Sequence, residues 1–71
     1  MSNELRTIET FKQMHRAHIL KAKLEEEEIE TFLSEETVLG QIDGVKVMVN
    51  DSNFDRAMEI YRVFEAENKI N

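Results

Sequence analysis

Apolar and polar residues alternate with two different periods along the chain, and each period predicts one kind of element. The opening run LRTIETF, residues 5–11, is rich in Thr, Ile and Phe, which is typical of a β-strand. From Lys12 to Glu27 the apolar residues recur at helical spacing, with Thr10 as the expected N-cap. One stripe within about 120° of arc is therefore predicted to be buried. Its members are Met14, Ala17, Leu20 and Leu24.

The middle of the chain returns to strand-like patterns. A second strand is predicted to begin at Ile29. The dipeptide Asp43-Gly44 predicts a type I′ hairpin turn, because both positions tolerate positive φ. This turn would join a short run, Val38–Ile42, to the strand Val45–Val49, and Gly40 would mark a bulge or bend.

After Asn50 the period becomes 3.6 again and predicts a second helix to about Glu67. Asp51 or Ser52 is the expected N-cap. Its apolar face is predicted to contain Phe54, Ala57, Ile60, Tyr61 and Phe64.

The resulting order, β-α-β-β-(β)-α, predicts an α+β fold of two layers. A strand, a helix and a second strand suggest a right-handed crossover that leaves the first strand parallel to its neighbour. Both helices are expected on one face of a three- or four-stranded sheet, as in a ferredoxin-like sandwich whose last strand is missing or very short. The 71 residues form one domain, 1–71, with an expected ordered core of about 4–67.

Charge is distributed unevenly and excludes some functions. The net charge is −6, and residues 25–45 hold eight acids and no base. An acidic chain repels a phosphate backbone, so we do not expect nucleic-acid binding. No apolar run approaches the roughly 20 residues that span a bilayer, and the N-terminus lacks the pattern of a signal peptide. We therefore expect a cytoplasmic protein without a membrane partner. There is no cysteine, so disulfides and thiolate metal sites are absent.

The pattern resembles a family of short prokaryotic domains of unknown function, DUF2007, labelled signal-transducing proteins and related in fold to the PII (GlnB-like) regulators. The resemblance lies in Thr10-Phe11, in Ala17, Leu20 and Leu24, in GVKVMV at 44–49 and in Ala57. It implies the ferredoxin-like fold and a regulatory role. The PII nucleotide-binding loop has no counterpart here, and no cofactor is expected. Glu28 stands where the family has glycine, so a positive φ there would cost on the order of 1 kcal/mol.

Two polar clusters are candidates for a ligand site. The four residues of the run Glu25–Glu28 cannot all converge on one ion, because successive helical residues point about 100° apart. Glu25 and Glu28 share a face and could supply two ligands of a Ca²⁺ or Mg²⁺ site, and an acidic docking patch is a further alternative. The run is read as a solvated helix end, with Lys21–Glu25 and Lys23–Glu27 as expected ion pairs. His15 and His18, three residues apart, could share a metal, but a firm site needs at least a third protein ligand. A small-ligand or metal sensor using this pair and nearby carboxylates is the alternative function.

The strand faces allow two interpretations, ordinary exposed apolar residues or an interaction surface. If Val45, Val47 and Val49 face the helices, then Phe32 and Met48 stand on the uncovered face of the sheet. With Ile19, which lies on the basic outer face of the first helix, they are the candidate interface residues. No nucleophile elbow or phosphate-binding glycine loop is present, so we expect no enzyme. The predicted function is a non-enzymatic regulatory or protein-interaction module, homodimeric through this sheet face or a strand edge.

Overall fold

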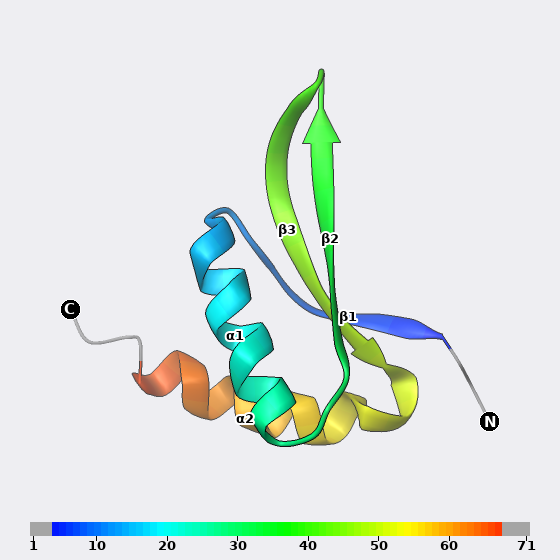
Figure 1. Ribbon diagram of the computed structural model, residues 1–71, viewed down its shortest axis with the longest axis vertical. Helices are drawn as coiled ribbons and strands as arrows, with labels where there is room; N and C mark the ends of the chain where they lie inside the picture. The colour runs from blue at the N-terminus through cyan, green and yellow to red at the C-terminus, as the bar shows by residue number, and fades with distance from the viewer. Residues whose placement is uncertain (1–3, 68–71) are drawn as a thin grey trace.

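The computed structural model describes residues 4–67, which form three strands and two α-helices. The predicted α+β class and the strand–helix–strand–strand–helix order are confirmed (Figure 1). The elements are β1 (Leu5–Phe11), α1 (Met14–Glu26), β2 (Thr31–Val38), β3 (Gln41–Asn50) and α2 (Phe54–Glu67), with a 3₁₀ turn at Asp51–Asn53.

The sheet has the order β1-β3-β2, and both neighbouring pairs are antiparallel. The prediction that β1 lies parallel to its neighbour is therefore wrong. β1 runs parallel to β2, but β3 lies between them. Burial explains this order, because Val45, Val47 and Val49 of β3 are each at most 1% exposed. The most apolar strand takes the central position, where both neighbours shield it.

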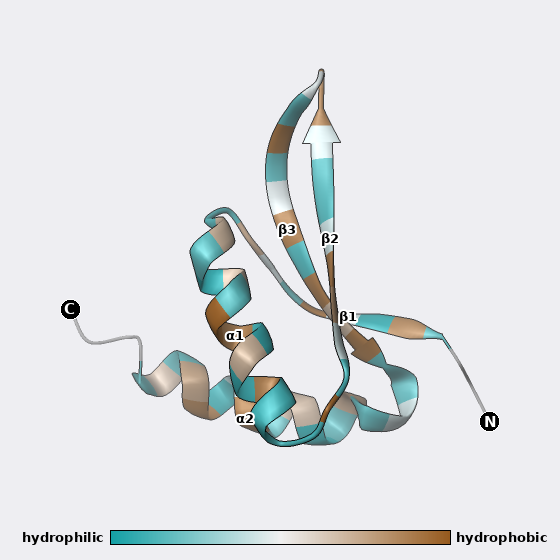
Figure 2. Cartoon of the chain, viewed as in Figure 1, coloured by the Kyte–Doolittle hydropathy of each residue, from teal (hydrophilic) through white to brown (hydrophobic). Residues whose placement is uncertain are grey.

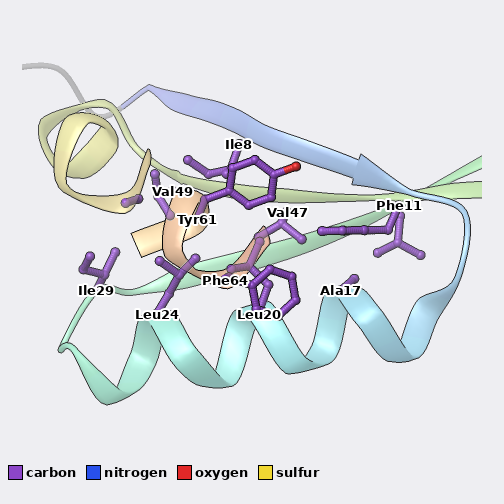
Figure 3. Close-up of a cluster of buried hydrophobic side chains, with 12 residues drawn as sticks. Ile8, Phe11, Ala17, Leu20, Leu24, Ile29, Val47, Val49, Tyr61 and Phe64 are labelled. Atoms are coloured by element: carbon purple, nitrogen blue, oxygen red, sulfur yellow. The ribbon is translucent and has the colours of Figure 1, made fainter. Parts of the chain in front are cut away.

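Both helices cover the same face of the sheet, and the core lies between these two layers. Figure 3 shows Leu20 and Leu24 of α1 pointing toward the sheet beside Phe64 of α2. The rings of Phe11, Tyr61 and Phe64 lie with centroids 6.3–6.5 Å apart, in edge and stacked arrangements. This two-layer packing is ferredoxin-like, as expected.

The start of α1 differs from the prediction. β1 continues through Phe11, which pairs with Val45, so Thr10 belongs to the strand and cannot cap the helix. Gln13 is the N-cap residue instead, and its side chain makes no capping hydrogen bond. Met14 then falls in the first turn of α1, and at 37% exposure it is not part of the buried stripe.

The second helical segment is capped one residue earlier than predicted. The Asn50 Oδ1 accepts hydrogen bonds from the Ser52 backbone N–H at 3.0 Å and from its hydroxyl at 2.9 Å. This cap opens the 3₁₀ turn that leads into α2. In α2, Ala57, Tyr61 and Phe64 are buried, whereas Phe54 and Ile60 are partly buried against the core.

The C-terminus of α1 shows which backbone conformation Glu28 adopts. Its φ is +63°, so a non-glycine residue does occupy the left-handed region. The Ile29 N–H donates to the Leu24 carbonyl and the Glu28 N–H to the Glu25 carbonyl, both at 3.0 Å. These two bonds are a Schellman motif, and the buried Leu24 and Ile29 supply its hydrophobic contact.

The β2–β3 turn lies at Leu39-Gly40, so the prediction of a turn at Asp43-Gly44 is wrong. Both turn residues have positive φ, +54° and +81°. Gly40, predicted to mark a bulge or bend, lies in the turn, and Gly44, predicted to form the turn, lies next to a bulge. Glu36 pairs with Gly44 but Thr37 pairs with Ile42, so Asp43 is the extra residue of a bulge. A Cβ on Gly44 would meet the Thr10 Cγ2 at 3.0 Å and the Phe11 carbonyl oxygen at 3.3 Å, so close approach to β1 explains this glycine.

The outer part of the hairpin extends beyond the rest of the molecule (Figure 1). β1 pairs with β3 from Asn50 to Val45, so the hairpin continues past it as two strands alone. Residues 35–43, here called the hairpin arm, are all exposed. The molecule measures 36 × 35 × 15 Å, and its radius of gyration is 12.3 Å. A compact chain of this length would have a radius of gyration near 11 Å, and the protruding arm contributes to the larger observed value.

Candidate interaction surfaces

The face of the sheet opposite the helices carries the first candidate surface. Phe32 and Met48 are direct partners across β2 and β3, and Met48 also pairs with Thr7 of β1. Because side chains alternate along a strand, these three point away from the buried Val47 and Val49. Phe32 is 37% exposed and Met48 is partly exposed. The structure thus brings the two predicted sheet residues together.

A salt bridge lies on the same face beside this apolar pair. The Lys46 Nζ is 3.0 Å from the Glu36 Oε2, and both side chains are well exposed. Lys46 is the partner of Thr10 in β1 and of Ser34 in β2, so this row of the sheet is polar. We call Thr7, Phe32, Met48 and the Lys46–Glu36 pair the open face.

The tip of the hairpin arm is a second apolar surface, which the sequence analysis did not identify. Val38 is 55% exposed, Ile42 54% and Leu39 98%. Apolar segments near the tip are visible in the hydropathy colouring of Figure 2. The predicted turn at Asp43-Gly44 hides this surface, because it assigns Val38 and Ile42 to one short strand. No feature of the sequence marks Leu39 as a left-handed turn residue, since leucine is unusual there.

Ile19 and the two histidines lie on the helix layer, apart from the open face. Ile19 is 48% exposed on α1. His15 and His18 are both exposed, and within residues 4–67 no group of three or more His, Cys, Asp or Glu side chains is placed to hold a metal ion. The structure therefore does not join the third candidate interface residue to the other two.

The glutamate run forms the end of α1, and its side chains diverge. Glu25 accepts a hydrogen bond from Lys21 at 2.9 Å, which confirms that predicted pair. The predicted Lys23–Glu27 pair is wrong, because both residues reach across to α2. Lys23 lies 3.5 Å from Glu67, and Arg56 lies 3.3 Å from Glu27. Tertiary packing of the helices thus replaces a pairing that spacing alone favoured.

A partly buried hydrogen bond links α2 to the edge strand β1. The Tyr61 hydroxyl donates to the Glu9 Oε2 at 2.6 Å. Burial, and then this bond to a carboxylate, raise the pKa of the Tyr61 phenol well above its usual value. Glu9 follows the point where the β1–β3 register shifts, between Thr7 and Glu9. The bulge at Ile8 aims Glu9 toward Tyr61, a contact that sequence spacing could not reveal.

Comparisons with known proteins identify a family and nothing finer. A family model described as "Putative prokaryotic signal transducing protein" matches residues 5–65. No curated protein and no solved structure matches the chain. None of the helices within residues 4–67 is long and apolar enough to cross a membrane. The match runs from the start of β1 into the last turn of α2, so it covers nearly all of the described fold.

Proposed function

This chain belongs to the family described as "Putative prokaryotic signal transducing protein", and we propose that it acts as a non-enzymatic interaction module that dimerises through its open face. The observation that carries the proposal is the pairing of Phe32 with Met48 on the side of the sheet that no helix covers. In the monomer this pair is only partly covered, since Phe32 is 37% exposed and Met48 is partly exposed. A partner that covers the remaining exposed area contributes about 25 cal/mol for each Å² of apolar surface removed from water.

The shape of the molecule supports a contact through this face. The domain measures 36 × 35 × 15 Å, and the open face spans all three strands of its sheet. Its accessible area is 5147 Å². A standard interface of roughly 800 Å² per partner would cover about a sixth of that area. A 71-residue domain also buries a small fraction of its own surface, so a second copy adds stability that its core lacks.

The strand edges are poorer contacts than the face. β2 carries Glu35 and Glu36 in sequence, and a two-fold pairing of β2 edges would bring like charges together. On the other side, β1 is short and irregular at Ile8, and a bulge in an edge strand disfavours pairing with another chain. The face avoids both obstacles, because its polar row is already paired as Lys46–Glu36.

Sedimentation tests this proposal directly. We expect the wild type to sediment as a dimer at high micromolar concentration, and the Phe32→Asp/Met48→Asp variant to sediment as a folded monomer. The matched control is Val38→Asp/Ile42→Asp, which adds the same charge to the exposed arm and should remain a dimer. A wild type that stays monomeric overturns the proposal, as does a control that loses the dimer equally.

The alternative of a metal or small-ligand sensor gains no support within the described residues. His15 and His18 are exposed, and no third ligand joins them. A thermal-shift screen with divalent metals and nucleotides addresses it, because a ligand well above its Kd raises the melting temperature of the fold it binds.

A further inference from the structure

A groove runs between the C-terminal part of α1 and the middle of α2, on the layer opposite the open face. Its floor is apolar and consists of Ile60, Val63 and Phe64. Phe64 is buried in the core, but Val63 is 56% exposed although it belongs to a helix that packs on the sheet. The groove has a volume of about 320 Å³. We call it the helix groove.

Two ion pairs join the helices beside the helix groove. Arg56 of α2 meets Glu27 of α1 at 3.3 Å, and Glu67 of α2 meets Lys23 of α1 at 3.5 Å. Both pairs join one helix to the other, and Lys23 and Glu27 also line the groove. The groove is present in the structure without a partner, which lowers the ordering cost of binding.

The walls of the helix groove carry uncompensated negative charge. Glu26 of α1 and Glu59 of α2 both line the groove. Neither makes an ion pair or side-chain hydrogen bond with the described residues. Lys23, the one base among the lining residues, is engaged with Glu67. An apolar floor between two free carboxylates is complementary to an apolar side chain flanked by cations.

The surroundings of the helix groove select a helical occupant. Both walls are helices, whose backbone groups are already bonded internally, so an extended peptide would find no strand edge to pair with. A helix satisfies its own backbone and presents side chains three and four residues apart on one face. The hairpin tip of a second copy is a poor occupant, because Glu36 and Asp43 near that tip would approach Glu26 and Glu59.

We propose that the helix groove binds a basic amphipathic helix of a partner protein. One apolar side chain of that helix packs on Val63 and Ile60, and a Lys or Arg one turn to either side pairs with Glu26 and Glu59. This site is separate from the open face, so a dimer can bind one such helix on each copy.

A labelled model peptide of about 14 residues, long enough for four helical turns, tests the proposal. The probe is an amphipathic leucine/lysine peptide, and the readout is fluorescence anisotropy with the full chain at low salt. We expect Glu26→Gln/Glu59→Gln to weaken binding by about tenfold or more. The matched control, Glu30→Gln/Glu35→Gln, removes the same charge from exposed positions outside the groove and should bind within about twofold of wild type.

The apolar half of the proposal has its own variants. Val63→Ser should weaken binding by at least about fivefold, whereas Leu39→Ser, which trims an even more exposed apolar residue, should leave it unchanged. Circular dichroism verifies that every variant is folded. Three results overturn the proposal. One is no binding of the leucine/lysine peptide by wild type up to about 100 μM, the second is an equal loss in both charge variants, and the third is equal binding of a glutamine/lysine peptide.

Discussion

The two halves of the β2–β3 hairpin share one backbone ladder but lie in opposite surroundings. At the base, Leu33 pairs with Val47 under both helices and beside β1. In the arm, Thr37 pairs with Ile42 with no third strand and no helix against them. A two-stranded hairpin is marginally stable alone, so the arm depends on the base for its order. Both regions have the same backbone pairing, so burial is what distinguishes the base from the hairpin arm.

The largest expected effect is on the free energy of unfolding, and it compares a core residue with a residue of the hairpin arm. Phe64, 1% exposed, packs against both Phe11 and Tyr61, and Phe64→Ala should cost about 3–5 kcal/mol of unfolding free energy. Leu39→Ala, at the 98% exposed tip, should change it by less than about 0.5 kcal/mol. Urea denaturation measures both. A comparable loss in the two variants would show that the arm is packed in solution.

The junction between base and arm should give the next largest effect. Gly44→Ala places a Cβ 3.0 Å from the Thr10 Cγ2 and should destabilise the fold by about 1–3 kcal/mol. Thr10→Ser removes that methyl group, so the double variant should recover part of the loss. A double-mutant cycle in urea gives the coupling. Strict additivity would mean that β1 does not approach Gly44 this closely.

Tyr61 makes the free energy of unfolding depend on pH in the alkaline range. Its folded pKa is raised above the unfolded value of about 10, so the folded state resists losing the phenol proton. The stabilisation is complete below pH 10 and is lost as pH rises above it, because the unfolded chain ionises first. Melting temperatures between pH 8 and 11 should fall less steeply for Tyr61→Phe. Parallel slopes in the two proteins would contradict the raised pKa of Tyr61 and its hydrogen bond to Glu9.

The smallest expected effects compare the two strained positions. Glu28 at φ +63° and Leu39 at φ +54° both occupy the region that glycine tolerates best. Glu28→Gly and Leu39→Gly should each stabilise the fold by about 0.5–1 kcal/mol. Neither position belongs to the open face, so sedimentation of both variants should match wild type. If either one destabilises the fold, its backbone is not left-handed in solution.

Periodicity predicted the helices, the class and the position of Phe32 and Met48 because each depends on local alternation. It failed at Gly44. A glycine that forms a hairpin turn and a glycine required by the close contact with Thr10 cannot be told apart in the sequence. Periodicity also failed for Lys23 and Glu27, whose partners lie on a helix more than 25 residues away. Periodicity could not predict the strand order, since only the assembled core shows that β3 is the central strand.

The most direct measurement of the central claim is an isotope-filtered NOE experiment on a mixture of labelled and unlabelled protein. It detects contacts between copies and ignores those within one. Dimerisation through the open face predicts intermolecular cross-peaks from the Met48 methyl group and the Phe32 ring, which lie side by side on that face, to open-face residues of the other copy. We expect those cross-peaks in wild type. Their absence at a concentration where the protein is dimeric, or intermolecular contacts from β2 edge residues instead, would contradict the account.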